Sequence, residues 1–192
     1  MLNDPWLGRW LPLIHERAGT RPVLEIGCGH GDDTATLSGQ GLPVIAFDLS
    51  RVSVAAARLR APAARIECRD IRDPFPADAQ GLGVVLASLS LHYFGWDETV
   101  AIVQRVRQVL RPGGVLLCRL NSTQDRHFGA GQGTQIEENF FEVDGQPKRF
   151  FDEATVKRLF ATGWHERSLQ HMHTRKYLRQ KALWEVMLER VD

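Results

Sequence analysis

The sequence predicts an α/β fold, in which a doubly wound, mostly parallel sheet carries helices on both faces. Short apolar runs alternate along the chain with segments of helical periodicity, as repeated βαβ units require. The runs lack a polar alternation, which is typical of strands buried on both faces of a parallel sheet. A length of 192 residues corresponds to a single domain.

The first two thirds of the chain supply the parallel part of this sheet. Five runs are expected to be strands, at residues 23–26, 44–47, 65–68, 83–87 and 115–120. Ser50 can cap a helix that stops before Pro62, and Asp97 can cap another that stops at Pro112. Residues 6–18, within an N-terminal segment 1–20, predict a short helix that covers the sheet.

The pattern changes beyond residue 120. Residues 121–151 predict an insertion that forms part of a lid, with a turn at Asp144–Gly145 between two short extended pieces. Its phenylalanines either line an apolar pocket or pack as a small core beneath the loop; they are Phe140, Phe141, Phe150 and Phe151. Asp152 can cap a helix with Gly163 just past its end. Residues 164–170 and 182–189 predict two final strands and an antiparallel edge.

Composition excludes several classes of protein. Lysine and arginine total 24 against 23 aspartates and glutamates, a balance that argues against a dedicated nucleic-acid binder. Three scattered cysteines without a CxxC pair favour the reducing cytoplasm over a disulfide scaffold. No stretch is apolar enough for a membrane span, and no signal peptide is expected. The basic group Arg175, Lys176, Arg179 and Lys181 predicts a solvated hairpin, with contact to an acidic substrate as the alternative. The histidines His165, His171 and His173 are not expected to bind a metal.

A glycine-rich loop is the strongest functional signal. Gly27, Gly29 and Gly31 follow the first buried strand, so the backbone can approach a nucleoside closely. A dinucleotide site would need a glycine at position 32, where Asp32 stands and would repel a pyrophosphate. Asp48 ends the second strand and can accept two ribose hydroxyls, and Asp70 follows the third. The pattern therefore predicts an adenosine-containing ligand without phosphates, which can be cationic.

At these positions the sequence resembles the class I S-adenosylmethionine-dependent methyltransferases. Glu25-x-Gly27-x-Gly29-x-Gly31 matches their first motif, Asp48 the ribose-binding acid, and Asp70–Ile71 the adenine-contacting pair. Residues 87–94 match the exit of the fourth strand, and residues 110–114 the turn before the fifth. The resemblance implies that residues 1–192 form one Rossmann-like domain with seven strands, the last antiparallel, and that S-adenosylmethionine is the cofactor. The implied cofactor-binding residues are Glu25, Gly27, Cys28, Gly29, Gly31, Asp48, Leu49, Asp70, Ile71 and Ser88.

The methyl acceptor is expected at the same ends of the strands. His92 and Tyr93 follow the fourth strand and are the candidates to touch the acceptor, with His92 as a possible general base or simply a packed side chain beside Trp96. Arg119 and Asn121, at the end of the fifth strand, could bind an acceptor carboxylate, as could Arg126.

The sequence favours a small-molecule acceptor over a nucleic acid. Residues 88–91 are Ser-Leu-Ser-Leu, whereas enzymes of the family that methylate amino groups of nucleic acids carry Asn/Asp-Pro-Pro-Tyr there, and no Pro-Cys dipeptide is present. The main hypothesis is methyl transfer to a small molecule. The alternatives are a non-catalytic cofactor-binding protein or partner subunit and, less favoured, a nicotinamide-dependent reductase.

Overall fold

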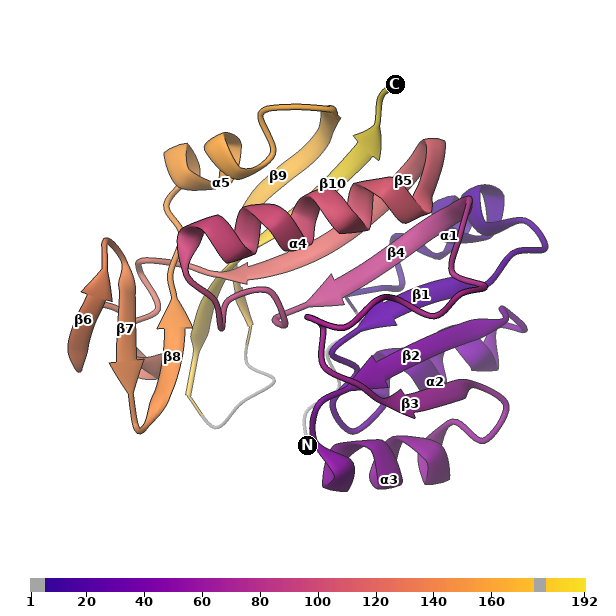
Figure 1. Cartoon of the computed structure of the whole chain (residues 1–192), viewed down its shortest axis with the longest axis horizontal. Helices are drawn as coiled ribbons and strands as arrows, with labels where there is room; N and C mark the ends of the chain where they lie inside the picture. Colours follow the sequence, from indigo (N-terminus) through magenta and orange to yellow (C-terminus); the bar gives the residue numbers. More distant parts are fainter. Residues whose placement is uncertain (1–5, 175–178) are drawn as a thin grey trace.

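The computed structural model describes residues 6–174 and 179–192, and its centre is a seven-stranded sheet (Figure 1). The strand order is β3-β2-β1-β4-β5-β10-β9, which confirms the predicted α/β, doubly wound sheet. The strands are β1 (Val23–Ile26), β2 (Val44–Asp48), β3 (Arg65–Cys68), β4 (Leu82–Ser88), β5 (Leu110–Asn121), β9 (Trp164–Thr174) and β10 (Lys181–Arg190).

Strand directions also follow the prediction. The strands from β1 to β5 pair in parallel, and β10 runs antiparallel to both of its neighbours, β5 and β9. The antiparallel strand therefore lies inside the sheet, and β9 forms the edge. The expectation of burial on both faces is confirmed for β1, β2, β4 and β5 and wrong for β3, an edge strand whose Arg65 is exposed.

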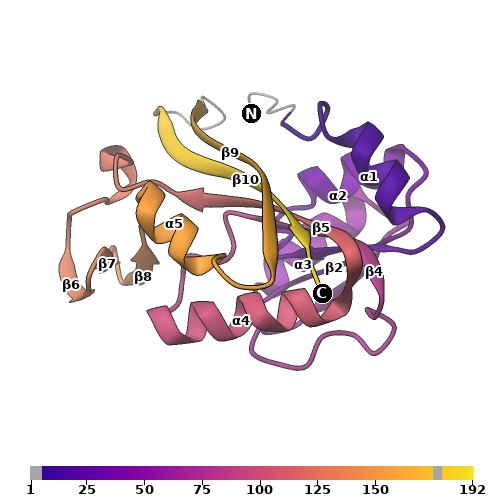
Figure 2. The same ribbon diagram turned by 90° about the horizontal axis from the view of Figure 1, so that it is seen from above.

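Helices cover both faces of the sheet (Figures 1 and 2). One apolar core joins β-strand side chains to α1 (Leu11–Ala18), α2 (Asp32–Gly39) and α3 (Arg51–Arg60). The other joins the opposite face to α4 (Trp96–Val109) and α5 (Glu153–Leu159). Successive residues of β1 enter alternate cores, Val23 the first and Leu24 the second, because side chains of a strand alternate between its faces.

The helix ends test the predicted caps. Ser50 and Asp152 cap α3 and α5 as expected, through the Ser53 N–H at 3.2 Å and the Thr155 N–H at 2.7 Å. The prediction for Asp97 is wrong, because α4 begins at Trp96 and its N–H donates to Glu137, 3.0 Å away.

Two other predicted helix bounds also change. Gly163 is not next to the end of α5, which stops at Leu159. The N-terminal helix begins at Leu11, four residues beyond the buried Leu7, because residues 6–10 form turns.

Residues 121–151, called the insertion below, contain a small antiparallel sheet beside the main one (Figure 2). Its strands are β6 (Thr134–Glu137), β7 (Phe140–Val143) and β8 (Gln146–Arg149), preceded by the short η1 (Arg126–Phe128). The predicted turn is confirmed: Asp144 and Gly145, with φ of 53° and 72°, join β7 to β8. Positive φ at both central residues is the conformation of a type I′ hairpin turn.

Three of the four phenylalanines of the insertion are packed in the interior. Phe140, Phe150 and Phe151 are buried, and Phe151 joins the core under α4 and α5. Of the predicted basic hairpin, Arg175 and Lys176 lie outside the described residues. The prediction is wrong for Lys181, which is buried and forms an ion pair of 2.7 Å with Asp125.

Candidate active site

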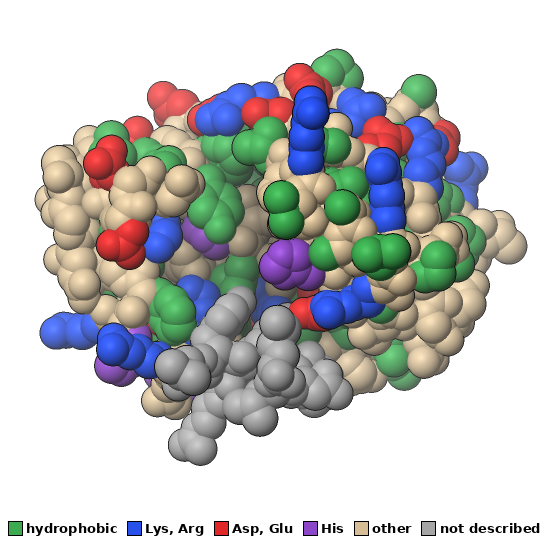
Figure 3. All heavy atoms as spheres, turned by 90° about the horizontal axis from the view of Figure 1, so that it is seen from below, with side chains coloured by type: hydrophobic (Ala, Val, Ile, Leu, Met, Phe, Trp, Pro, Cys, Tyr) green, Lys and Arg blue, Asp and Glu red, His purple; other side chains and the backbone are tan. Residues whose placement is uncertain are grey.

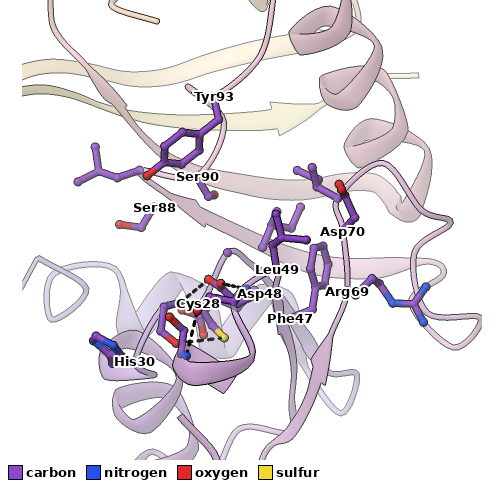
Figure 4. Close-up of a pocket in the computed structure, with 18 of the residues that line it drawn as sticks. Cys28, His30, Phe47, Asp48, Leu49, Arg69, Asp70, Ser88, Ser90 and Tyr93 are labelled. Carbon is purple, nitrogen blue, oxygen red and sulfur yellow. Dashed lines mark hydrogen bonds between the residues drawn. The ribbon is translucent and has the colours of Figure 1, made fainter. Parts of the chain in front are cut away.

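A cavity of about 930 Å³ opens where the parallel strands end. Its walls come from the C-terminal ends of β1, β2, β4 and β5, from the loop after β3, and from β8 of the insertion. Ligands of open α/β sheets bind at this edge, where the strand order reverses. Figure 4 shows Asp48 and Cys28 on one side of the cavity and Tyr93 and Ser88 across from them.

The glycine loop needs its glycines for different reasons. Gly27 has a φ of 71°, and a Cβ added there would lie 2.4 Å from the Cβ of Ser90. Gly29 also has a positive φ, but its missing Cβ would face open space. Gly31 lies outside the cavity lining. A Cβ added there would lie 2.9 Å from Ala57 of α3, so the absent side chain makes room for that helix. Gly31 therefore serves helix packing, and its predicted contact with the cofactor stays a prediction.

Asp48 is held beside this loop by two backbone groups. The N–H of Gly29 donates to Oδ2 and that of Ser50 to Oδ1, each at 2.9 Å. The carboxylate thus joins the end of β2 to the loop after β1, and it also lines the cavity. Each carboxylate oxygen can accept more than one hydrogen bond, so Asp48 keeps acceptor capacity for a ligand.

Two further predicted residues lie at the base of the loop. Glu25 is 2% exposed and accepts a hydrogen bond of 2.5 Å from the Thr34 hydroxyl. Burial, followed by the charges of Glu25 and Asp48, raises the pKa of the Cys28 thiol to about 12. Cys28 therefore stays protonated at neutral pH and cannot act as a thiolate nucleophile.

An apolar wall with an acidic end forms the side of the cavity near β2 and β3. Phe47, Leu49 and Ile71 supply the apolar surface, and Leu49 is 67% exposed. Asp70 lies at the far end of this wall and accepts the Arg72 N–H at 2.9 Å (Figure 4). An apolar wall that ends in a carboxylate suits a planar ring with an amino group.

Ser88 and Arg119 meet at the ends of β4 and β5. The Nε of Arg119 donates to the Ser88 hydroxyl at 2.9 Å, and the guanidinium lies 4.2 Å from the centre of the Trp6 ring. Ser88 is a predicted cofactor-binding residue and Arg119 a predicted acceptor-binding residue. Both line the cavity, although Arg119 is only 3% exposed. The indole N–H of Trp6 also donates to the Asp33 carboxylate at the start of α2, so Trp6 contacts both α2 and Arg119 of β5.

The structure separates the predicted acceptor residues. Tyr93 lines the cavity and is 40% exposed, whereas neither His92 nor Asn121 lines it. Burial, followed by the charges of Lys181 and Lys148, lowers the pKa of His92 to about 3. His92 is therefore a buried, neutral side chain outside the lining of the cavity, an arrangement that favours the packed alternative over a general base. Asn121 is 1% exposed and pairs through its backbone with Leu183 and Phe151.

Sequence reasoning missed the part of the cavity that the insertion supplies. Gln146, Pro147 and Lys148 of β8 line one wall of the cavity, and Ser90, which follows β4 and lies beside Gly27, also lines the cavity. The Asp144–Gly145 turn located the hairpin in the sequence but could not show which side faces the cavity. Among the described residues, no group of three or more His, Cys, Asp or Glu side chains could hold a metal, and no helix could span a membrane.

Comparison with known proteins agrees with this geometry. Residues 23–114 match a family model described as a methyltransferase domain. The chain is 32% identical over 100 residues to trans-aconitate 2-methyltransferase of Paracidovorax citrulli, a match that covers 51% of this chain and 38% of that protein. It is 33% identical over 125 residues to a probable S-adenosylmethionine-dependent methyltransferase of Mycolicibacterium smegmatis, covering 65% and 46%.

Solved structures share the whole fold. A S-adenosylmethionine-dependent methyltransferase from Methanosarcina mazei matches with a TM-score of 0.78 at 16% identity, covering 94% of this chain and 97% of that one. The 1,6-didemethyltoxoflavin-N1-methyltransferase of Burkholderia thailandensis, solved with 1,6-didemethyltoxoflavin and S-adenosylhomocysteine, matches with 0.72 at 20% identity, covering 94% and 76%.

Each of the two matches to curated relatives covers less than half of the relative's own length. The structural likeness, at such low identity, bears on the fold. Sequence match and fold nevertheless agree with the glycine loop and the acids at the strand ends, and together they support a class I S-adenosylmethionine-dependent methyltransferase.

Proposed function

We propose that this chain transfers a methyl group from S-adenosylmethionine to a small-molecule acceptor. One observation carries the proposal: a glycine loop and carboxylates from successive strand ends surround a single cavity, with an apolar wall between the carboxylates. An adenosyl group that is cationic at its sulfur suits acidic surroundings, whereas the phosphates of a dinucleotide would be repelled by them.

The residues of the cavity fit this cofactor. Asp48 would accept the ribose hydroxyls, and Asp70 the amino group of an adenine between Leu49 and Ile71. The open space at Gly29 leaves the backbone accessible to the amino acid part, for which Glu25 lies at the base of the loop. When bound, S-adenosylmethionine supplies a methyl group on a positively charged sulfur.

The chain contributes alignment and exclusion of water to the transfer. Displacement at a methyl group requires the acceptor atom in line with the leaving sulfur more than it requires an acid or base. Tyr93 lies across the cavity from the glycine loop, where it would border the acceptor, and Ser90 lines the cavity beside Gly27 (Figure 4). The insertion, as a lid, would complete the wall with β8 and keep water out.

The size and charge of the molecule support a small acceptor. A volume of about 930 Å³ is near the upper end of ligand pockets, which suits a cofactor with a small second molecule. On the face seen in Figure 3, acidic and basic side chains are interspersed, whereas a nucleic-acid surface is usually a basic patch. The matched relative acts on trans-aconitate according to its name, and that acceptor is small.

A transfer assay tests the proposal against the alternatives. The protein is incubated with methyl-labelled S-adenosylmethionine and fractionated small-molecule extract, and the label is followed into products. We expect transfer, and a rise in melting temperature with S-adenosylhomocysteine but not with NAD or NADP. Binding of S-adenosylhomocysteine without transfer to any fraction would instead indicate a non-catalytic binding protein.

A further inference from the structure

The charges that line the cavity are divided between its two sides. The side formed by the glycine loop, β2 and the loop after β3 carries Asp48 and Asp70. Two arginines on that side are already paired, Arg69 with Glu67 at 2.8 Å and Arg72 with Glu98 at 2.6 Å. The opposite side, formed by β5 and β8, brings Arg119 and Lys148 to the cavity.

Lys148 is the unusual member of this second group. It lies on β8 across from Phe141 of β7, is half-buried, and stands between the uncharged Pro147 and the guanidinium of Arg149 in sequence. Two other buried cations near the insertion have carboxylate partners: Lys181 pairs with Asp125, and Arg149 with Glu137. Among residues 6–174 and 179–192, no carboxylate forms an ion pair with Lys148.

The surroundings of Lys148 are already positive. Its charge contributes to lowering the pKa of two buried neighbours, His92 and Lys181, although burial is the larger cause for both. A half-buried ammonium near like charges is costly unless an anion approaches it. The cavity beside Lys148 is the place from which such an anion can come.

We propose that Lys148 binds an anionic oxygen group on the methyl acceptor and thereby selects acidic acceptors. This inference rests on the proposed function, since it concerns the side of the same cavity that is formed by β5 and β8, called the acceptor side below. The side that carries Asp48 and Asp70, called the cofactor side below, is acidic and would repel such a group. The two sides therefore orient the acceptor with its anion toward β8 and the rest of the molecule toward the sulfur. Lys148 is a specificity-determining residue that leaves the chemistry of transfer unchanged.

Binding to the cofactor-loaded protein tests this inference. The protein is saturated with S-adenosylhomocysteine and titrated calorimetrically with trans-aconitate, benzoate and inorganic phosphate, and with trimethyl trans-aconitate and benzamide as neutral counterparts. We expect at least one anion to bind and its neutral counterpart to bind more weakly. The carboxylates and the phosphate separate the two sources of an anionic oxygen group.

Substitutions then assign the binding to Lys148. Lys148→Gln should weaken the anion roughly ten- to a hundredfold, as expected for loss of a hydrogen bond to a charged group, and Lys148→Arg should restore most of it. Lys157→Gln is the matched control, because Lys157 is exposed on α5 and pairs with Glu153. With an accepted substrate, Lys148→Gln should raise KM and leave kcat nearly unchanged.

The outcomes separate this inference from the proposed function. If S-adenosylhomocysteine binds normally while none of the three anions binds at millimolar concentration, or if Lys148→Gln binds the anion like wild type, the role of Lys148 is overturned and the cofactor site stands. If the wild-type protein does not bind S-adenosylhomocysteine, the proposed function is overturned instead.

Discussion

The two sides of the cavity are built in different ways. The cofactor side lies within residues 25–72, where short loops follow buried strands and neighbouring backbone groups hold the acids, as Gly29 and Ser50 hold Asp48. The acceptor side depends on the insertion, whose position relies on contacts between residues far apart in sequence. Glu137 of β6, for example, accepts the N–H of Trp96, forty-one residues earlier.

This difference teaches where each part of the activity can change. Local loops on a rigid sheet keep one geometry, so the cofactor side suits a ligand that all members of a family share. A lid fixed by a few distant contacts can vary its lining without disturbing the core. Substitutions on the two sides should therefore affect different binding constants, and the following predictions test that separation.

The largest effect is expected from Gly27→Ala on the cofactor side. The new Cβ would meet Ser90 and would also adopt a φ of 71°. Backbone strain of about 1–2 kcal/mol and overpacking of about 1–3 kcal/mol should together weaken S-adenosylhomocysteine binding by about thirtyfold or more, or lower the free energy of unfolding by about 2–5 kcal/mol. Calorimetry and denaturant melts measure both.

Gly41→Ala is the control for this experiment. Gly41 has a similar φ of 77°, but a Cβ there would meet nothing within 4 Å. The control should lose only the strain contribution to stability and keep its affinity for S-adenosylhomocysteine. Equal behaviour of the two variants would contradict the close approach between Gly27 and Ser90.

A smaller effect is expected from Arg149→Met on the acceptor side, where the substitution should weaken binding of the acceptor and leave binding of the cofactor unchanged. Arg149 is 3% exposed, pairs with Glu137, and donates through Nε to the Phe94 carbonyl at 3.1 Å. Removing it should cost about 2–3 kcal/mol of stability, since partly buried charge pairs and their hydrogen bonds break together. Acceptor KM should rise while the affinity for S-adenosylhomocysteine stays near wild type; an equal loss of both affinities would show that the two sides are coupled.

The smallest effect concerns the pH dependence of stability through His92. The insertion covers this residue, and the backbone N–H of Arg149 donates to the His92 carbonyl at 2.7 Å. Its pKa of about 3 is below the usual 6.5, so between these values the unfolded chain binds a proton that the folded chain does not. Acidification from pH 7 to pH 5 should therefore cost about 2 kcal/mol of unfolding free energy through this residue.

His92→Leu isolates this contribution. The variant should show a weaker dependence of unfolding free energy on pH over the same range, by about 2 kcal/mol, in denaturant melts. A pH dependence identical to that of wild type would mean that His92 is hydrated in the folded protein, and hence that the insertion does not cover it.

The sequence predicted the cofactor side better than the acceptor side, for a physical reason. Buried strands and the residues that end them are local patterns, so Asp48 and Asp70 could be placed at the sheet edge in advance. The role of Gly31 could not, because it depends on Ala57 of a later helix. His92 follows a strand end as Tyr93 does, yet only the packing of the insertion buries one and leaves the other in the cavity. Lys148 gave no signal, because a lysine in a hairpin is ordinarily solvated.

We propose above that the acidic side of the cavity binds the adenosyl cofactor through Asp48. Calorimetric titration of S-adenosylhomocysteine into wild type, Asp48→Ala and the exposed control Asp144→Asn tests it most directly. We expect Asp48→Ala to lose about 1.5–3 kcal/mol of binding free energy, as for hydrogen bonds to a charged group, and Asp144→Asn to bind like wild type. An unchanged affinity in a folded Asp48→Ala protein would contradict the placement of the cofactor and with it the account of the site.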